Sequence, residues 1–353
     1  MEKRSAVKLS MFVLAVCGAV AAVSALRPDP EPVLDRALRA RTIDTLAAKL
    51  NEHYVFPAKA GQMAASLQQR QLEGKYDGID NGYRLARQLT ADLHGVAKDL
   101  HMKVGYHPMM ALPHDDRPAP ASRAQWEQHT NFFERLMQRR AAAREVKYVG
   151  RLGDKVGYVK ITSFPDSYLM PDKYAETMDE LADTAGLIMD LRGNRGGDPL
   201  AVVLLISYFV DGRTRLNDIW ERDTGLSVQH YTEEKLDGRR YGGGKPVMIL
   251  VDSGTGSAGE DFAYTMQALK RATVIGEPTW GGAHPTGMYP LGGHFYASIP
   301  NQRSISPITG TNWEGTGVKP DVETTRDRTL AVARDLMRRR LRDSTTLITS
   351  LQH

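Results

Sequence analysis

Apolar side chains recur at the three- and four-residue spacing of amphipathic helices through the first hundred residues. This spacing predicts helices over 33–51, 58–72 and 81–100, followed by one short strand over 101–106. The helical stretch itself carries no strong strand signal. We therefore expect a small, all-helical N-terminal domain over residues 26–106.

A second pattern begins at residue 146, where short apolar runs alternate with helical periodicity. Strands that alternate with helices are typical of α/β domains. The predicted elements are strands over 155–164, 187–191, 247–251, 272–275 and 294–299, and helices over 174–185, 200–210, 257–270 and 327–342. We expect an α/β core domain over residues 146–345.

A connector of residues 107–145 joins the two domains. It consists of a polar, Pro-rich loop over 108–120 and a polar stretch over 122–145 that has the composition of a single helix. No internal repeat is apparent, so the sequence indicates two domains of different kinds.

The first 25 residues have the pattern of a secretory signal peptide. A basic start is followed by an apolar run over 11–23, which is short for a bilayer span, and by small residues before a cleavage site. Cys17 lies inside the apolar run, where a lipid anchor is the less favoured interpretation. We expect a secreted or periplasmic protein whose mature chain has no cysteine and no integral membrane span.

Composition and charge narrow the function classes. The 353 residues are 41% hydrophobic and 25% charged, as in ordinary globular proteins, with 46 basic and 42 acidic side chains. Loss of the first 25 residues leaves 43 basic and 41 acidic residues, a net charge of +2. This balance gives no case for nucleic-acid binding. No zinc motif or paired cysteine ligands occur, so we expect neither metal nor cofactor.

The strand-to-helix turn that contains Ser257 is the most informative local feature, and three interpretations of it remain open. Ser257 and Glu260 fit the S-x-x-E capping box of an ordinary helix start. Residues 254–259 also match the G-x-G-x-x-G nucleotide fingerprint, with Glu277 as the later acid. In the third interpretation Ser257 is a nucleophile, and the backbone N–H of Ala258 helps to hold an oxyanion.

A nucleophilic serine needs a base and further oxyanion donors, which must come from elsewhere. Gly196 and Gly197 follow another apolar strand, and their backbone N–H groups could form an oxyanion hole, although an ordinary Gly-rich turn has the same appearance. His101 and His284 are candidate bases, and Glu314 is an acid in a turn-rich loop. Taken singly, each has an ordinary explanation as a surface or loop residue.

Several spaced segments resemble one known family. They are 156–161, Leu191-Arg-Gly-Asn-Arg-Gly-Gly197, Ser257-Ala-Gly-Glu260 and the long run 276–321, together with 50–57, 89–93 and 99–104 in the N-terminal half. In this order they are similar to the C-terminal processing (tail-specific) serine peptidases, in the branch related to interphotoreceptor retinoid-binding protein. The resemblance covers nearly the whole chain after the signal peptide.

The resemblance implies a crotonase/ClpP-like α/β core with the active site between core and helical domain. Ser257 falls on the family's nucleophile position, and Gly196 and Ala258 fall near its oxyanion donors. Gly282 stands where the processing proteases have their catalytic lysine. The tricorn-like members use histidine and glutamate instead, at positions that match His101 and Glu314.

The family's PDZ domain is missing, because the connector leaves no room for it. The leading hypothesis is a serine peptidase that acts on a peptide or protein through Ser257, His101 and Glu314, with His284 as the alternative base. The other hypothesis is a non-catalytic binder of a hydrophobic ligand on the same fold. The sequence does not indicate an oligomeric state.

Overall fold

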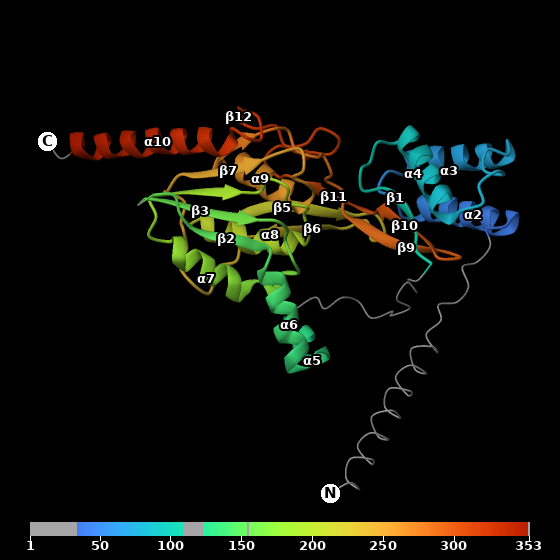
Figure 1. Ribbon diagram of the computed structural model, residues 1–353, viewed down its shortest axis with the longest axis horizontal. Coiled ribbons are helices and arrows are strands. Elements are labelled where there is room, and N and C mark those ends of the chain that lie inside the picture. The colour runs from blue at the N-terminus through green and yellow to red at the C-terminus, as the bar shows by residue number, and fades with distance from the viewer. Residues whose placement is uncertain (1–33, 109–122, 154, 352–353) are drawn as a thin grey trace, which may run out of the picture.

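The computed structural model describes residues 34–108, 123–153 and 155–351. The expected signal peptide, Cys17 and nearly all of the Pro-rich loop lie outside the described residues. Figure 1 shows two lobes side by side, which we call the core lobe and the helical lobe. Within the described part of the chain, no helix combines the length and apolarity that a bilayer span needs.

A six-stranded sheet in the order β12-β8-β7-β4-β3-β2 forms the centre of the core lobe. Its strands run parallel except β2, which pairs antiparallel with β3. The strands are β2 (Val146–Arg151), β3 (Val156–Ile161), β4 (Gly186–Asp190), β7 (Val247–Val251), β8 (Thr273–Gly276) and β12 (Val322–Glu323). The α/β core is therefore confirmed.

Alternate residues of the central strands pack against helices on opposite faces of the sheet. Leu187 and Met189 contribute to the larger core, with the helices α7 (Pro171–Leu181), α8 (Pro199–Ile206) and α9 (Ala258–Ala268). Ile188, between them, packs into a smaller core under α10 (Thr329–Leu351). Burial on both faces explains why these strands are continuous apolar runs in the sequence.

The helical lobe consists of α2 (Arg36–His53), α3 (Pro57–Leu72) and α4 (Gly82–Val96), and it also contains a sheet. That sheet joins β1 (Lys103–Tyr106) to β10 (Phe295–Pro300) and β9 (Thr286–Gly292). Phe295, Ala297 and Ile299 are buried in the same core as the helices. The N-terminal lobe is thus completed by a hairpin from much later in the chain, which Figure 1 shows in orange beneath α2 and α4.

The connector forms two helices rather than the single helix expected over 122–145. They are α5 (Arg123–His129) and α6 (Phe132–Ala143). Asn131 separates them because its side chain caps Glu134 N–H and the Glu134 carboxylate accepts from Asn131 N–H, at 2.9 Å each. A small sheet of β11 (Gln302–Ile305), β5 (Arg215–Glu221) and β6 (Ser227–Tyr231) completes the core lobe.

Candidate active site at the junction of the two lobes

Ser257 lies at the carboxyl end of the central strand β7, at the start of α9. Its backbone has φ 53° and ψ −122°. An ordinary N-cap residue is extended, and a positive φ is unfavourable for a residue with a β-carbon. The side chain is half-buried. Capping alone does not require this conformation, whereas strained backbone is common at functional sites.

Glu260 holds the Ser257 turn to the loop that follows β8. Its buried carboxylate accepts the Ser257 N–H at 2.8 Å, which is one half of the expected capping box. It also accepts from three groups of the 279–285 loop: Thr279 Oγ1 at 2.5 Å, Gly281 N–H at 2.5 Å and Gly282 N–H at 3.0 Å. Burial raises the pKa of Glu260, and these donors oppose the rise.

The 191–197 loop follows β4, the strand next to β7, so its end meets the Ser257 turn at one sheet edge. Asn194, which is fully buried, ties the two together: its carbonyl oxygen accepts Gly256 N–H and its side-chain oxygen accepts Gly196 N–H, both at 2.8 Å. A β-carbon on Gly196 would lie 2.5 Å from Ser257 Cβ. Only glycine allows so close an approach.

Two backbone N–H groups beside Ser257 donate to no acceptor within the described residues, those of Gly197 and Ala258. The N–H of Gly196, by contrast, is bonded to Asn194. An oxyanion hole requires uncommitted donors beside the nucleophile. The geometry therefore favours Gly197 and Ala258 as the donors, with Gly196 allowing the loop to reach them.

The G-x-G-x-x-G interpretation fails on the same criterion. The N–H of Gly254 donates to Asp252 Oδ1 at 3.0 Å, that of Gly256 to Asn194 and that of Gly259 to Gly256 O at 2.9 Å. A phosphate-binding loop needs its N–H groups free for the ligand. The glycines of this turn serve the internal packing of the loop instead.

His101 reaches the site from the turn before β1, in the helical lobe. Its ring meets that of Trp280 edge-on at 4.9 Å, and the backbone N–H of Trp280 in turn donates to Thr255 O at 3.0 Å. A β-carbon on Gly282 would lie 2.6 Å from His101 Cε1. His101 therefore occupies the space of a side chain at position 282, where the resemblance places the lysine of the processing proteases.

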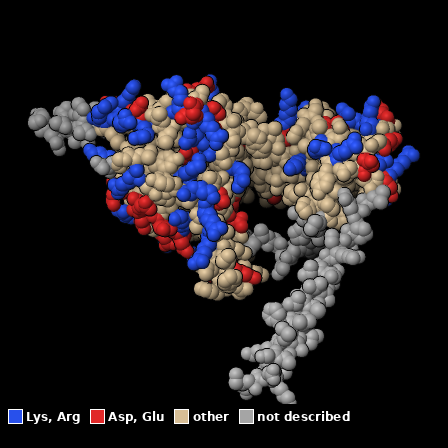
Figure 2. Space-filling view, viewed as in Figure 1, with Lys and Arg blue, Asp and Glu red and all other residues tan. Residues whose placement is uncertain are grey.

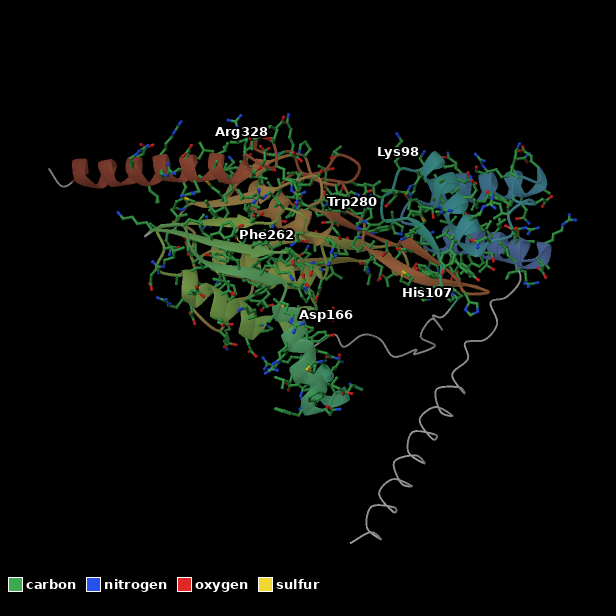
Figure 3. The ribbon with its side chains drawn as sticks, in the orientation of Figure 1. Lys98, His107, Asp166, Phe262, Trp280 and Arg328 are labelled. Atoms are coloured by element: carbon green, nitrogen blue, oxygen red, sulfur yellow. The ribbon has the colours of Figure 1, made fainter. Side chains whose placement is uncertain are left out.

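The His101 imidazole has no hydrogen bond to Ser257, and its Nδ1 is buried without a partner. Burial lowers the pKa of His101, and the nearby charge of Asp99 opposes this. A neutral imidazole is the form that can accept a proton. Figure 3 shows Trp280 on the side of the core lobe that faces the helical lobe, and Lys98 on the helical lobe across the junction.

Glu314 contacts His284 rather than His101. Its Oε2 accepts the Ala283 N–H at 2.5 Å and lies 3.5 Å from His284 Nδ1. His284 is buried and bonds Asp99 Oδ2 at 2.8 Å. Burial, together with the charge of Asp99, raises the pKa of Glu314 to about 7. The two candidate histidines thus lie in one neighbourhood, with Asp99 between them.

Asp99, His284 and Glu314 are also a group that could hold a metal ion, because one ligand atom of each lies within 4.8 Å of the others. The same atoms already have partners. Tyr54 Oη donates to Asp99 Oδ2 at 3.3 Å, in addition to the bond from His284. Protein hydrogen bonds therefore satisfy the atoms of this cluster that face one another.

Sequence reasoning missed Asn194, Asp99 and Trp280. Asn194 and Asp99 lie inside the motifs that carried the family resemblance, three residues after Leu191 and two before His101. The sequence did not indicate that these two side chains are buried, because short polar side chains in loops are normally exposed. Trp280 gave no signal beyond its place in a Gly-rich segment.

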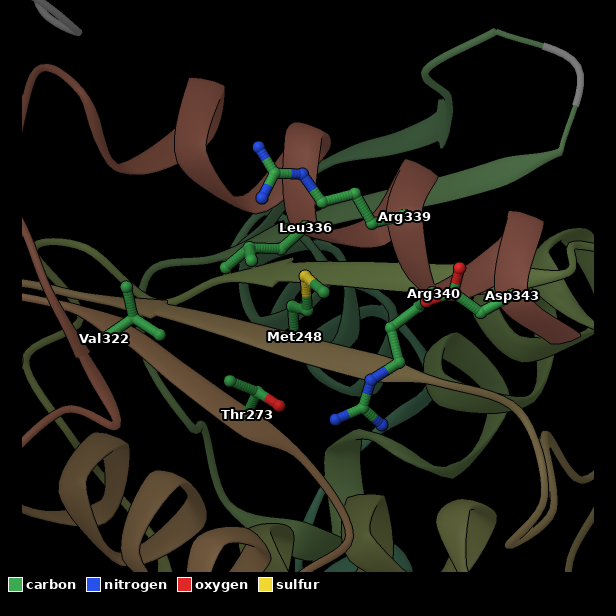
Figure 4. A pocket seen from close by; sticks show the side chains of 7 residues that line it. All are labelled: Met248, Thr273, Val322, Leu336, Arg339, Arg340 and Asp343. Atoms are coloured by element: carbon green, nitrogen blue, oxygen red, sulfur yellow. The ribbon is translucent and has the colours of Figure 1, made fainter.

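A cavity of about 480 Å³ lies away from this site, under α10. Met248 and Thr273, at the starts of β7 and β8, line it together with Leu336 and the side chains of Arg339 and Arg340 (Figure 4). Ligand sites of α/β sheets lie at the carboxyl ends of the strands. This cavity is at the opposite end, so it is separate from the Ser257 region.

Two family models match the chain in succession. The N-terminal domain of family S41 peptidases in eukaryotic IRBP matches residues 34–139, and peptidase family S41 itself matches residues 155–324. The chain belongs to peptidase family S41. Its homologues include carboxyl-terminal processing proteases, which are hydrolases.

Among the curated relatives, the carboxyl-terminal-processing protease of Synechocystis sp. is 30% identical over 131 residues. The match covers 37% of this chain and 29% of that protein, so the chain spans less than a third of the relative's length. The family assignment therefore describes a shared peptidase region rather than two proteins alike throughout.

Two solved structures share the fold. The photosystem II D1 C-terminal processing protease superposes with a TM-score of 0.50 and 16% identity, over 82% of this chain and 94% of that one. The tricorn protease gives 0.57 and 14%, over 86% of this chain and 37% of the other. At these identities the likeness concerns the fold, and it confirms the helical N-terminal region joined to a β-sheet core.

Proposed function

We propose that this chain is a serine peptidase that hydrolyses peptide bonds in a peptide or protein substrate, with Ser257 as nucleophile. The observation that carries the proposal is the backbone at Ser257: a positive φ beside two uncommitted N–H groups, those of Gly197 and Ala258. This combination suits a tetrahedral oxyanion. Membership of a peptidase family supports the same reaction class.

In the proposed reaction, Ser257 Oγ attacks the scissile carbonyl while His101 takes its proton. The N–H groups of Gly197 and Ala258 receive the negative charge on the carbonyl oxygen. His101 then returns the proton to the leaving amine, and water repeats the sequence on the acyl-enzyme. His101 does not bond Ser257 without substrate, and hydrogen bonds of this kind often form only in the complex.

Glu314 is the proposed acid of a Ser-His-Glu site. Its carboxylate supports His101 through His284 and Asp99, since the direct contact of Glu314 is with His284. The bond from His284 Nδ1 to Asp99 is the bond that a triad histidine makes to its orienting acid, so His284 stays the alternative base. The nearby charge of Asp99 favours the cation that forms on His101.

The proposed location is outside the cytoplasm, in the periplasm or secreted. The support is the order of charges and apolar residues in 1–25, which fits a signal peptide. Fractionation of cells that express the full chain tests it. We expect a shortened protein in the soluble fraction outside the cytoplasm, and an uncleaved cytoplasmic protein would contradict this.

Hydrolysis is tested with a library of fluorogenic peptides, using the purified protein and a Ser257→Ala variant. We expect cleavage by the parent and none by the variant, with mass spectrometry of the products locating the cut. Equal cleavage by both would assign the activity to a contaminant and contradict the proposal.

A further inference from the structure

The turn that carries His101 depends on a carboxylate buried between the two lobes. Asp99 is 3% exposed, and its Oδ1 accepts the backbone N–H of His101 at 3.3 Å. Its own carbonyl oxygen accepts Met102 N–H at 3.1 Å, which closes the turn. The orientation of Asp99 therefore determines where the His101 backbone stands.

His284 reaches Asp99 from the other lobe. It lies in the 279–285 loop of the core lobe, is 4% exposed, and places Nδ1 2.8 Å from Asp99 Oδ2. Carboxylates accept hydrogen bonds, so the proton lies on His284 Nδ1. Phe56 packs edge-on against the ring at 5.5 Å, which fixes its plane. His284 is thus a rigid donor aimed at Asp99.

The far side of His284 is fixed as well. Glu314 Oε2 lies 3.5 Å from the same Nδ1 and is itself held by Ala283 N–H at 2.5 Å. The charged and titratable groups around the imidazole are Asp99, Glu314 and His101, with the Tyr54 hydroxyl on Asp99. His284 lies between the carboxylates of Asp99 and Glu314, and it therefore links the loop that carries Glu314 to the His101 turn.

His101 needs such support because nothing holds its own ring by a hydrogen bond. Its Nδ1 is unpartnered, and Trp280 and Gly282 contact the ring only by packing. A base must stand within hydrogen-bond reach of the nucleophile when substrate is bound. A displacement of about 1 Å can cost on the order of 10²-fold in rate.

We propose that His284 is a positioning residue: it holds Asp99 across the lobe junction so that Asp99 sets the place of His101 and faces the charge that His101 gains. The proposal rests on the proposed role of His101 as base. It assigns His284 no contact with the substrate. It also explains why a buried histidine lies between two carboxylates in the 279–285 loop.

The test compares His284→Ala with His284→Asn in the full chain, because the Asn amide can still donate where Nδ1 did. We expect His284→Ala to lower kcat for peptide hydrolysis about 10²-fold with KM little changed, since the base is displaced by about 1 Å. His284→Asn should recover at least a tenth of the parental kcat. Melting temperatures confirm that each variant is folded.

A second readout separates this proposal from the proposed function. Hydrogen exchange at the His101 amide should be slow in the parent and in His284→Asn, and fast in His284→Ala, whether or not the protein cleaves peptides. Unchanged exchange in His284→Ala would overturn the proposal even for an active enzyme. Full kcat in a folded His284→Ala would overturn it too, and a parent without activity but with the expected exchange would contradict only the proposed function.

Discussion

Ser257 adopts a backbone conformation that is unfavourable by itself, at an estimated cost of about 1–3 kcal/mol. The Glu260 carboxylate at 2.8 Å and the start of α9 hold it there. Ser257, Gly196 and the uncommitted N–H groups of Gly197 and Ala258 therefore form one structural unit. His101 is the residue whose role depends most on the junction of the lobes.

Replacement of His101 tests the base directly. We expect His101→Ala to reduce kcat by about 10²–10⁴-fold, which is the usual contribution of general acid–base catalysis, with the melting temperature nearly unchanged. His107→Ala is the matched control, because His107 is an exposed histidine just beyond β1. Full activity of His101→Ala would transfer the base role elsewhere.

Two loops and two turns make the site, and buried polar side chains hold them together. Asn194 joins the 191–197 loop to the Ser257 turn, and Glu260 joins that turn to the 279–285 loop. Buried polar groups are costly when unpaired, so each such bond fixes one arrangement. The elements therefore present the site without a ligand to organise them.

Loss of the Asn194 side chain should loosen the oxyanion donors. Asn194→Ala removes the acceptor of Gly196 N–H and the donor to Ile161 O, which lies 3.0 Å away. We expect a loss of stability of about 1–3 kcal/mol and a larger relative fall in kcat than in substrate affinity. Urea unfolding and steady-state kinetics measure the two effects, and an unchanged kcat would contradict a link between this loop and catalysis.

A methyl group at position 282 should displace His101. The β-carbon of Gly282→Ala would lie 2.6 Å from His101 Cε1 and 2.5 Å from Cζ3 of Trp280, the ring that packs on His101, well inside van der Waals contact with both. We expect at least a tenfold loss of kcat, by the sensitivity of rate to about 1 Å of misplacement. Gly244→Ala is the control, since no atom lies within 4 Å of its added carbon. Equal activities of the two variants would place His101 elsewhere.

Prediction from sequence succeeded where one segment determines its own structure. The apolar run 247–251 is β7 residue for residue, because burial on both faces leaves a continuous signal. The sequence did not indicate that the hairpin of β9 and β10 belongs to the helical lobe, because β10 pairs with Lys103–Tyr106, about 190 positions earlier. The contact of Glu314 with His284 was hidden for the same reason, as it depends on how distant loops meet.

Charge is spread over both lobes of the whole molecule: Figure 2 shows basic and acidic side chains on the visible face of each. Two buried carboxyl groups differ from this surface population. Burial raises the pKa of Glu314 to about 7 and that of Asp261 to about 6. Both groups lie in or beside the elements that form the site, so the pH dependence of stability reports on its interior.

The folded protein should lose stability as pH rises from about 4 to 7. Glu314 and Asp261 bind protons more tightly when folded than their ordinary pKa values of 4.5 and 3.8 allow, so unfolding releases protons in this window. The free energy of unfolding should fall by at most about 1.4 kcal/mol per pH unit per group. Urea unfolding of the parent and of a Glu314→Gln/Asp261→Asn variant measures this, and the same slope in both would contradict the assignment.

The most direct test of an activated serine at position 257 is the intact mass of the protein after exposure to a fluorophosphonate. We expect a single adduct on the parent chain and none on Ser257→Ala, with slower labelling of His101→Ala. No adduct on a folded parent, or an adduct that persists in Ser257→Ala, would contradict it.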